Sequence, residues 1–217
     1  MSRSDGDTGV YGGRTLSDRV EDRRRQLIVA GYRILADEGG SALTMRAVTR
    51  EAQLSPRYFY ESFSSRDELL VAIFDDAVQR VRAVVVEAVR AADHHPAARI
   101  RAAFDSAAAL FEDDPRIVRV ALRNAFAENA LRDHAYSVLP NFVLTTAFGL
   151  AGGVSVNTVA LRLDVSALSG SVVTLFLDWT EGRLNATRAE LVDYLTDMVD
   201  GMVCRQAEAM GQLTGAP

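Results

Sequence analysis

The stretch LTMRAVTREAQLSPRYFYESFSSRDELL, residues 43–70, constrains the fold most, because three helix-start signals follow one another within it. Thr44 is a favourable N-cap for a first short helix. Ser55 then supplies a second cap, followed by Pro56 at the first helical position, where the missing N–H costs nothing. Ser65 begins a capping box of the form S-x-x-E and opens a longer helix. The stretch therefore predicts two short helices, a tight turn between them, and a long helix after them.

The second short helix carries three aromatic residues in a row. On a helix that advances about 100° per residue, Phe59 and Phe63 share one face and can pack inward. Arg57 then points the opposite way, and Tyr58 and Tyr60 lie on the flanks, where their hydroxyl groups prefer polar partners. Half-buried packing is the ordinary explanation for such tyrosines. The turn and caps around them instead favour a surface that binds a partner.

Helical periodicity continues along most of the chain, and no segment has a convincing strand pattern. A first helix should run from Asp18 to the glycine pair 39–40, and the long helix that Ser65 opens should end near Ala92. The later helical segments are expected at 97–112, 115–127, 130–149, 165–181 and 187–211, with a kink or break at Pro140. The predicted fold class is all-α.

The order of short helix, tight turn and short helix, braced by the first helix, is a helix-turn-helix arrangement, whose second helix can enter a DNA major groove. The run 43–70 resembles the DNA-binding segment of the tetracycline-repressor (TetR-like) family of bacterial transcriptional regulators. The matching residues are Thr44, Arg46, Ser55, Phe59, Tyr60, Phe63 and the closing Ser65, Arg66, Asp67, Glu68 and Leu69.

This resemblance implies a transcriptional regulator, acting as a repressor that a small, largely apolar effector releases from a two-fold related site in double-stranded DNA. Phosphate contacts would come from Thr44, Tyr60 and Arg66. Base contacts would come from Pro56, Arg57 and Tyr58, and Arg46 and Ser55 complete the expected DNA-binding set. Effector binding would move the long fourth helix and change the separation of the two DNA-reading domains of a homodimer.

Three residues depart from the family pattern. Thr49 and Gln53 stand where alanine and glycine are usual, and Ser62 stands where a larger ring or a basic side chain is common. Gln53 ends the first short helix at a turn that often needs positive φ, so we expect a left-handed backbone there.

The predicted domains are a tail over residues 1–16, a helix-turn-helix DNA-binding domain over 17–64, and an effector-binding and dimerisation domain over 65–217. The net charge also differs between the N-terminal and C-terminal parts of the chain. Residues 1–66 hold eleven arginines and nine acids, whereas residues 67–217 hold thirteen arginines and twenty acids. A mildly basic end joined to an acidic body fits a chain that touches DNA at one end only.

Composition excludes other classes. No apolar run approaches the ~20 residues that span a bilayer, and the N-terminus lacks the apolar stretch of a signal peptide, so we expect a cytoplasmic protein without a membrane partner. A single cysteine, Cys204, allows no intrachain disulfide and is expected in the core. The adjacent His94 and His95 are poorly spaced for joint ligation on a helix. No metal or cofactor is predicted.

The C-terminal helices suggest two further surfaces. The predicted dimer interface comprises Val172, Leu175, Phe176, Trp179, Leu195, Met198 and Met202, because these two helices carry more apolar residues than one neighbour can cover. The predicted effector pocket comprises the polar residues Asn124, Tyr136, Asn141, Thr145 and Thr146, set among small apolar side chains. Hydroxyls bonded to helix carbonyls would explain some of these polar residues equally well.

Two alternatives remain open from the sequence. One is a helical enzyme that uses His134 with Asp133 or Asp178, and the other is a scaffold that uses its helix-turn-helix to hold a protein. An acid and a histidine without a placed nucleophile are weak evidence for catalysis. Titration with duplex DNA separates the three functions, since only the regulator should bind at nanomolar concentration with strong salt dependence.

Overall fold

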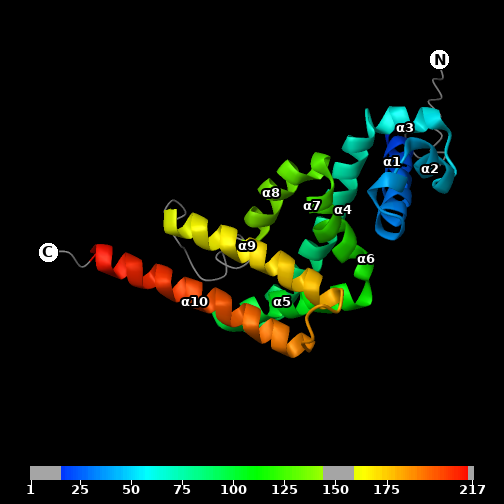
Figure 1. Ribbon diagram of the computed structural model, residues 1–217. Coiled ribbons are helices and arrows are strands. Elements are labelled where there is room, and N and C mark those ends of the chain that lie inside the picture. The colour runs from blue at the N-terminus through cyan, green and yellow to red at the C-terminus, as the bar shows by residue number, and fades with distance from the viewer. Residues whose placement is uncertain (1–15, 144–158, 215–217) are drawn as a thin grey trace, which may run out of the picture.

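The computed structural model describes residues 16–143 and 159–214, and all secondary structure in these residues is helical, which confirms the predicted fold class (Figure 1). The helices α1 (Leu16–Asp37), α2 (Met45–Glu51) and α3 (Pro56–Ser62) gather at one end of the molecule. A short 3-10 turn, η1 (Gly40–Ala42), joins α1 to α2. These bounds follow the predicted ones closely because local capping signals set them.

The caps form largely as the sequence indicates. The Thr44 hydroxyl accepts a hydrogen bond from the Ala47 amide at 3.2 Å, and the Ser65 hydroxyl accepts one from the Glu68 amide at 3.1 Å. Glu68 accepts hydrogen bonds from the Ser64 hydroxyl at 2.7 Å and the Ser64 amide at 2.6 Å, and these hold the pKa of its carboxyl below the ordinary value. Ser55 occupies the N-cap of α3 but makes no side-chain cap bond.

The turn between α2 and α3 confirms the predicted left-handed residue. Gln53 has a φ of 55°, and it is the one non-glycine residue with positive φ in the described part of the chain. The Leu54 amide donates to the Thr49 carbonyl at 2.9 Å, and the Gln53 amide donates to the Arg50 carbonyl at 3.1 Å. This pairing satisfies the last carbonyls of α2 and turns the chain toward α3.

The long helix α4 (Arg66–Ala91) joins the three-helix end to the body of the molecule (Figure 1). It packs on α1, on α5 (Pro96–Asp113) and on α8 (Asn129–Val143). One hydrophobic core therefore continues from the three-helix end into the body along α4.

The predicted helix 115–127 forms with a change of geometry in its middle. It consists of α6 (Pro115–Val118), a π-helical turn η2 (Arg119–Arg123) and α7 (Asn124–Ala127). Helical periodicity does not predict this wider turn. The helix α8 continues past Pro140 to Val143, so the proline does not split it, and a kink at this position stays a prediction.

The last two described helices, α9 (Val159–Thr180) and α10 (Arg188–Thr214), lie side by side and extend away from the three-helix end (Figure 1). The prediction placed the start of α9 at residue 165, too late. By length and composition, α9 is also apolar enough to cross a membrane, and 28% of its most apolar window is buried. The core helix of a soluble protein passes the same test, and α9 is interrupted by Arg162, Asp164 and Asp178, so it is not the unbroken apolar run that the sequence analysis excluded.

Candidate nucleic-acid interface and interior cavity

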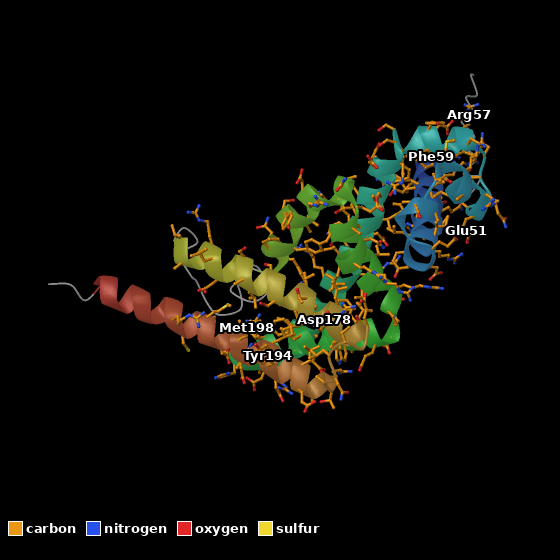
Figure 2. The ribbon with its side chains drawn as sticks, viewed as in Figure 1. Glu51, Arg57, Phe59, Asp178, Tyr194 and Met198 are labelled. Carbon is orange, nitrogen blue, oxygen red and sulfur yellow. The ribbon has the colours of Figure 1, made fainter. Side chains whose placement is uncertain are left out.

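Helix α3 divides its side chains between core and solvent, as predicted. Phe59 is 2% exposed and Phe63 is 1% exposed, with their ring centroids 5.9 Å apart. Arg57 has 84% of its side chain exposed, and Tyr60 is 64% exposed. Figure 2 shows Arg57 at the end of the molecule far from Tyr194 and Met198 of α10. An exposed arginine and tyrosine thus stand on a helix whose other face is anchored.

The other predicted DNA contacts lie on the same small domain. Thr44, Arg46, Ser55 and Pro56 are all exposed. Tyr58 is half-buried beneath the guanidinium of Arg23, which stands 4.5 Å from the ring centroid. The structure therefore brings these residues together at the start of α2 and along α3, the arrangement that a helix-turn-helix presents to a major groove.

Charge on α3 is partly balanced within the protein. Glu61 accepts a hydrogen bond from Arg57 at 2.8 Å and lies 3.7 Å from Arg23. Because the Arg57–Glu61 pair is exposed and spaced four residues apart on the helix, it contributes little stability and can open at low cost. Arg57 is thus held in place without being withdrawn from solvent.

Arg66 occupies a different environment from the other predicted phosphate contacts. Its guanidinium donates to the Gly40 carbonyl at 2.7 Å, to the Leu43 carbonyl at 3.0 Å and to Glu128 at 3.1 Å. A Cβ atom on Gly40 would lie 1.6 Å from the Glu128 carboxylate, so a larger residue there would displace the end of the Glu128 side chain. Arg66 therefore binds the η1 turn to the body, a role that the sequence did not indicate.

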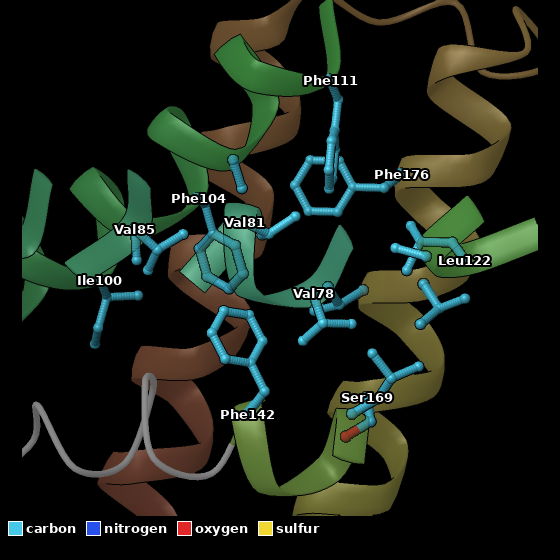
Figure 3. Close-up of a pocket in the computed structure, with 16 residues that line it drawn as sticks. Val78, Val81, Val85, Ile100, Phe104, Phe111, Leu122, Phe142, Ser169 and Phe176 are labelled. Carbon is cyan, nitrogen blue, oxygen red and sulfur yellow. The ribbon is translucent and has the colours of Figure 1, made fainter. Parts of the chain in front are cut away.

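The body contains a partly open cavity of about 90 Å³ between α4, α5, η2, α8 and α9 (Figure 3). Its single hydroxyl belongs to Ser169, which donates to the Val165 carbonyl at 2.6 Å. The described wall therefore offers a ligand apolar surface only. The lining residues are Val78, Val81, Val85, Ile100, Ala103, Phe104, Ala107, Phe111, Ala121, Leu122, Leu139, Phe142, Ser169, Val172, Val173 and Phe176.

The polar residues predicted for a pocket lie elsewhere. Asn124 points toward α1 and donates to the Leu35 carbonyl at 3.4 Å, Tyr136 is 62% exposed, and Asn141 is also exposed. Thr145 and Thr146 lie outside the described residues. The spacing of the valines on α4 and of the small residues on α5 is the only sequence signal for the cavity, and it does not differ from that of an ordinary core.

The predicted dimer residues are mostly covered within the chain. Phe176, Leu195 and Met202 are at least 92% buried by their own neighbours, and Phe176 packs edge-on against Phe111 with centroids 5.0 Å apart. Val172, Leu175, Trp179 and Met198 are half-buried. The exposed apolar side chains of this region are instead Val159 and Leu163 of α9 and Tyr194 of α10.

The residues of the enzyme alternative do not come together. His134 pairs with Asp75 of α4 at 2.7 Å, and Asp178 pairs with Arg183. In the described residues, no group of three or more histidine, cysteine or acidic side chains is placed to hold a metal ion. Cys204 is exposed, contrary to the expectation of a core position.

The fold and the exposed face of α3 are those of the class of helix-turn-helix DNA-binding proteins. Residues 27–73 match the family model described as bacterial regulatory proteins, tetR family. The resemblance to this family seen in the sequence of the helix-turn-helix is therefore confirmed.

Two curated relatives agree with this assignment. The chain is 34% identical over 70 residues to the HTH-type transcriptional regulator BetI of Rhizobium meliloti, covering 32% of this chain and 34% of BetI. It is 28% identical over 123 residues to the HTH-type transcriptional activator FasR of Mycolicibacterium smegmatis, covering 56% of each. The chain thus matches between about a third and about half of the length of these relatives.

A solved structure extends the likeness to most of the fold. A TetR family transcription regulator from Marinobacter aquaeolei VT8 superposes with a TM-score of 0.62 and 17% identity, covering 86% of this chain and 98% of that one. At this identity the likeness concerns the fold alone.

Proposed function

We propose that this protein is a ligand-responsive, sequence-specific DNA-binding transcriptional regulator of the bacterial cytoplasm. It acts as a homodimeric repressor that a small, largely apolar effector releases from its site. The observation that carries the proposal is the helix-turn-helix, in which Arg57 and Tyr60 are exposed on α3 while Phe59 anchors the opposite face.

The dimer is supported by the uncovered apolar surface of α9. Val159 is 63% exposed and Leu163 is 66% exposed on a helix that is apolar on nearly all sides. Further along, the small residues Gly170 and Thr174 border a groove between α8 and α9 that also includes Tyr136. A second copy that lays its own α9 here would cover these residues, as paired helices do in four-helix interfaces.

The effector is supported by the cavity. Its walls come from five helical elements, including α4, which leads directly to the DNA-binding domain. Every polar group of the described lining already has a hydrogen-bond partner. An apolar molecule therefore gives up the fewest hydrogen bonds to water on entering the cavity. A ligand shifts the DNA affinity only if it binds the DNA-competent and released arrangements unequally.

The test begins with selection of bound duplexes from a random pool by the full-length protein, followed by footprinting of the enriched sequence. We expect a protected site with two-fold symmetry, whose half-site centres lie a whole number of helical turns apart, ~34–36 Å for one turn. A footprint without dyad symmetry would contradict the homodimer, and failure to enrich any sequence would contradict the regulator.

The sign of regulation needs its own measurement, since one relative bears the name of an activator. Transcription in vitro from a promoter that contains the selected site should fall when the protein is added. An increase would contradict repression and leave sequence-specific binding intact.

A further inference from the structure

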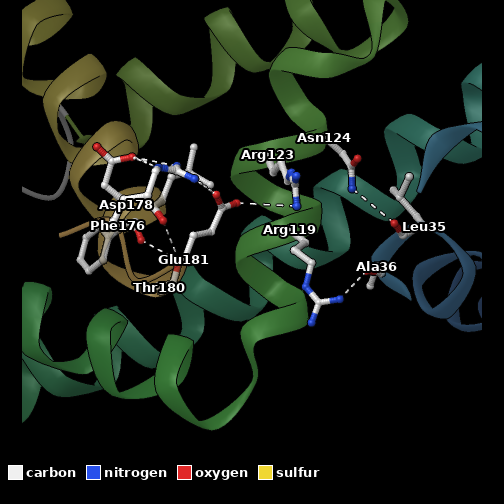
Figure 4. A network of polar contacts seen from close by, with 11 residues as sticks. Leu35, Ala36, Arg119, Arg123, Asn124, Phe176, Asp178, Thr180 and Glu181 are labelled. Atoms are coloured by element: carbon white, nitrogen blue, oxygen red, sulfur yellow. Dashed lines mark hydrogen bonds and ion pairs between the residues drawn. The ribbon is translucent and has the colours of Figure 1, made fainter. Parts of the chain in front are cut away.

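The segment that forms one wall of the cavity also holds the end of α1. Ala121 and Leu122 of η2 line the cavity, and Arg119 and Asn124 of the same helical stretch reach the last turn of α1 (Figure 4). We propose that Arg119 and Asn124 are positioning residues that fix the DNA-binding domain against the body and transmit movement of the cavity wall to it. This inference rests on the proposed function and names the residues through which its regulation passes.

The first step concerns the carbonyls that end α1. The last four carbonyls of a helix have no partner within it and require caps from elsewhere. The Ile34 carbonyl accepts a hydrogen bond from the Glu38 amide at 2.8 Å. The next two carbonyls are satisfied from the body: Leu35 by the Asn124 side chain at 3.4 Å, and Ala36 by Arg119 at 2.8 Å.

Electrostatics favours the same arrangement. The C-terminal end of a helix attracts a cation, and α1 has no basic residue in its own last turn. Arg119 supplies that cation from η2. It also lies 3.8 Å from Asp37, the last residue of α1, which pairs with Arg116 at 2.9 Å. Three charged or amide side chains of one short segment thus converge on the end of α1.

A further contact ties α1 to the start of the same segment. The Tyr32 hydroxyl donates to Asp114 at 3.1 Å. Burial, together with the Asp114 carboxylate, raises the pKa of Tyr32 well above its ordinary value, so that the hydroxyl keeps its proton and remains a donor. Residues 114–124 therefore contact the helix α1 from residue 32 to its end. Independent movement of the two segments would break these hydrogen bonds and ion pairs.

The second step concerns the size of the cavity. A cavity of about 150 Å³ in another protein accommodates benzene, and this one measures about 90 Å³. A ligand of that size that lies wholly between these walls must therefore displace one of them. The η2 wall has a π-helical turn, a rare geometry that is frequent at functional sites. Val120 and Ala121 are almost fully buried, so η2 moves as one packed unit. Arg119 and Asn124, which cap α1, move with it.

The same segment offers a matched control. Arg123 belongs to η2 and carries the same charge, but it faces away from α1 and pairs with Glu181 at 3.7 Å (Figure 4). Arg119→Met and Arg123→Met remove one charge each from the same turn. Only the first removes a cap of α1.

The experiment measures hydrogen–deuterium exchange of the full-length protein without DNA, after circular dichroism has established that each variant is folded. In Arg119→Met combined with Asn124→Leu, we expect amides of residues 36–43 to exchange about tenfold faster than in the wild type, because two caps are lost. Arg123→Met should leave them unchanged. Equal acceleration by Arg123→Met, or none in the capping variant, would overturn the proposal.

A cavity-filling change tests transmission. Ala121→Leu, or the milder Ala121→Val if leucine prevents folding, adds volume on η2 inside the cavity. It should accelerate exchange in residues 36–43 in the wild-type background and add nothing in the capping variant. Additive effects would mean that the route does not pass through Arg119 and Asn124. Since this readout uses no DNA, it can succeed or fail independently of operator binding.

Discussion

Replacement of Gln53 by glycine should stabilise the protein, because Gln53 holds a φ of 55° at the turn between α2 and α3. A left-handed backbone costs a non-glycine residue roughly 1–2 kcal/mol. Glycine loses more conformational freedom on folding, which costs about 0.5–1 kcal/mol. The Gln53 side chain is exposed, so its removal sacrifices little packing. The net expectation for Gln53→Gly is a gain of up to ~1 kcal/mol.

Urea unfolding of the full-length protein, followed by circular dichroism, measures this gain. Gln53→Ala is the matched control, because alanine shortens the side chain but keeps the Cβ atom that conflicts with positive φ. The fluorescence of the single tryptophan, Trp179 of α9, follows the unfolding of the body as a second probe. A glycine variant that unfolds at the same or lower urea concentration than the wild type would refute the strain argument.

Three further perturbations follow from the structure. Arg57→Ala should weaken binding to the selected duplex by about 1–3 kcal/mol and binding to random duplexes much less, as measured by fluorescence anisotropy. An equal loss on both duplexes would mean that this face of α3 does not read bases. Arg66→Ala should lower the free energy of unfolding by about 1.5–3 kcal/mol, because Glu128 and two carbonyls lose a charged donor, and an unchanged urea midpoint would contradict the tether between η1 and the body. Leu163→Glu should convert the dimer to a monomer at micromolar concentration by light scattering, whereas Val86→Glu on α4 should not; a dimer that survives Leu163→Glu would place the interface elsewhere.

Sequence reasoning predicted the local features of the fold well. The starts of α2, α3 and α4 depend on Thr44, Pro56 and Ser65, whose effects reach only a few residues along the chain. The left-handed Gln53 was predictable for the same reason, since it ends one helix just before another begins. The inward direction of Phe59 and Phe63 followed from helical spacing alone.

Features that depend on distant partners were not predictable in this way. Asn124 was assigned to a pocket because it is polar within an apolar helix, yet its partner Leu35 lies 89 positions away in the chain. Arg66 binds Glu128, which is 62 positions away. Periodicity indicates which face of a helix is apolar but not which helix covers it. For this reason Phe176 and Leu195 were expected at a dimer interface and lie in the core of the chain itself.

The most direct test of the regulator is a titration of the full-length wild-type protein against its selected duplex and against a random duplex of equal length, at one fixed salt concentration near physiological. We expect nanomolar affinity for the selected duplex, at least about 10³-fold tighter than for the random one. Equal affinity for the two duplexes, or no binding to either, would contradict sequence-specific DNA recognition by this protein.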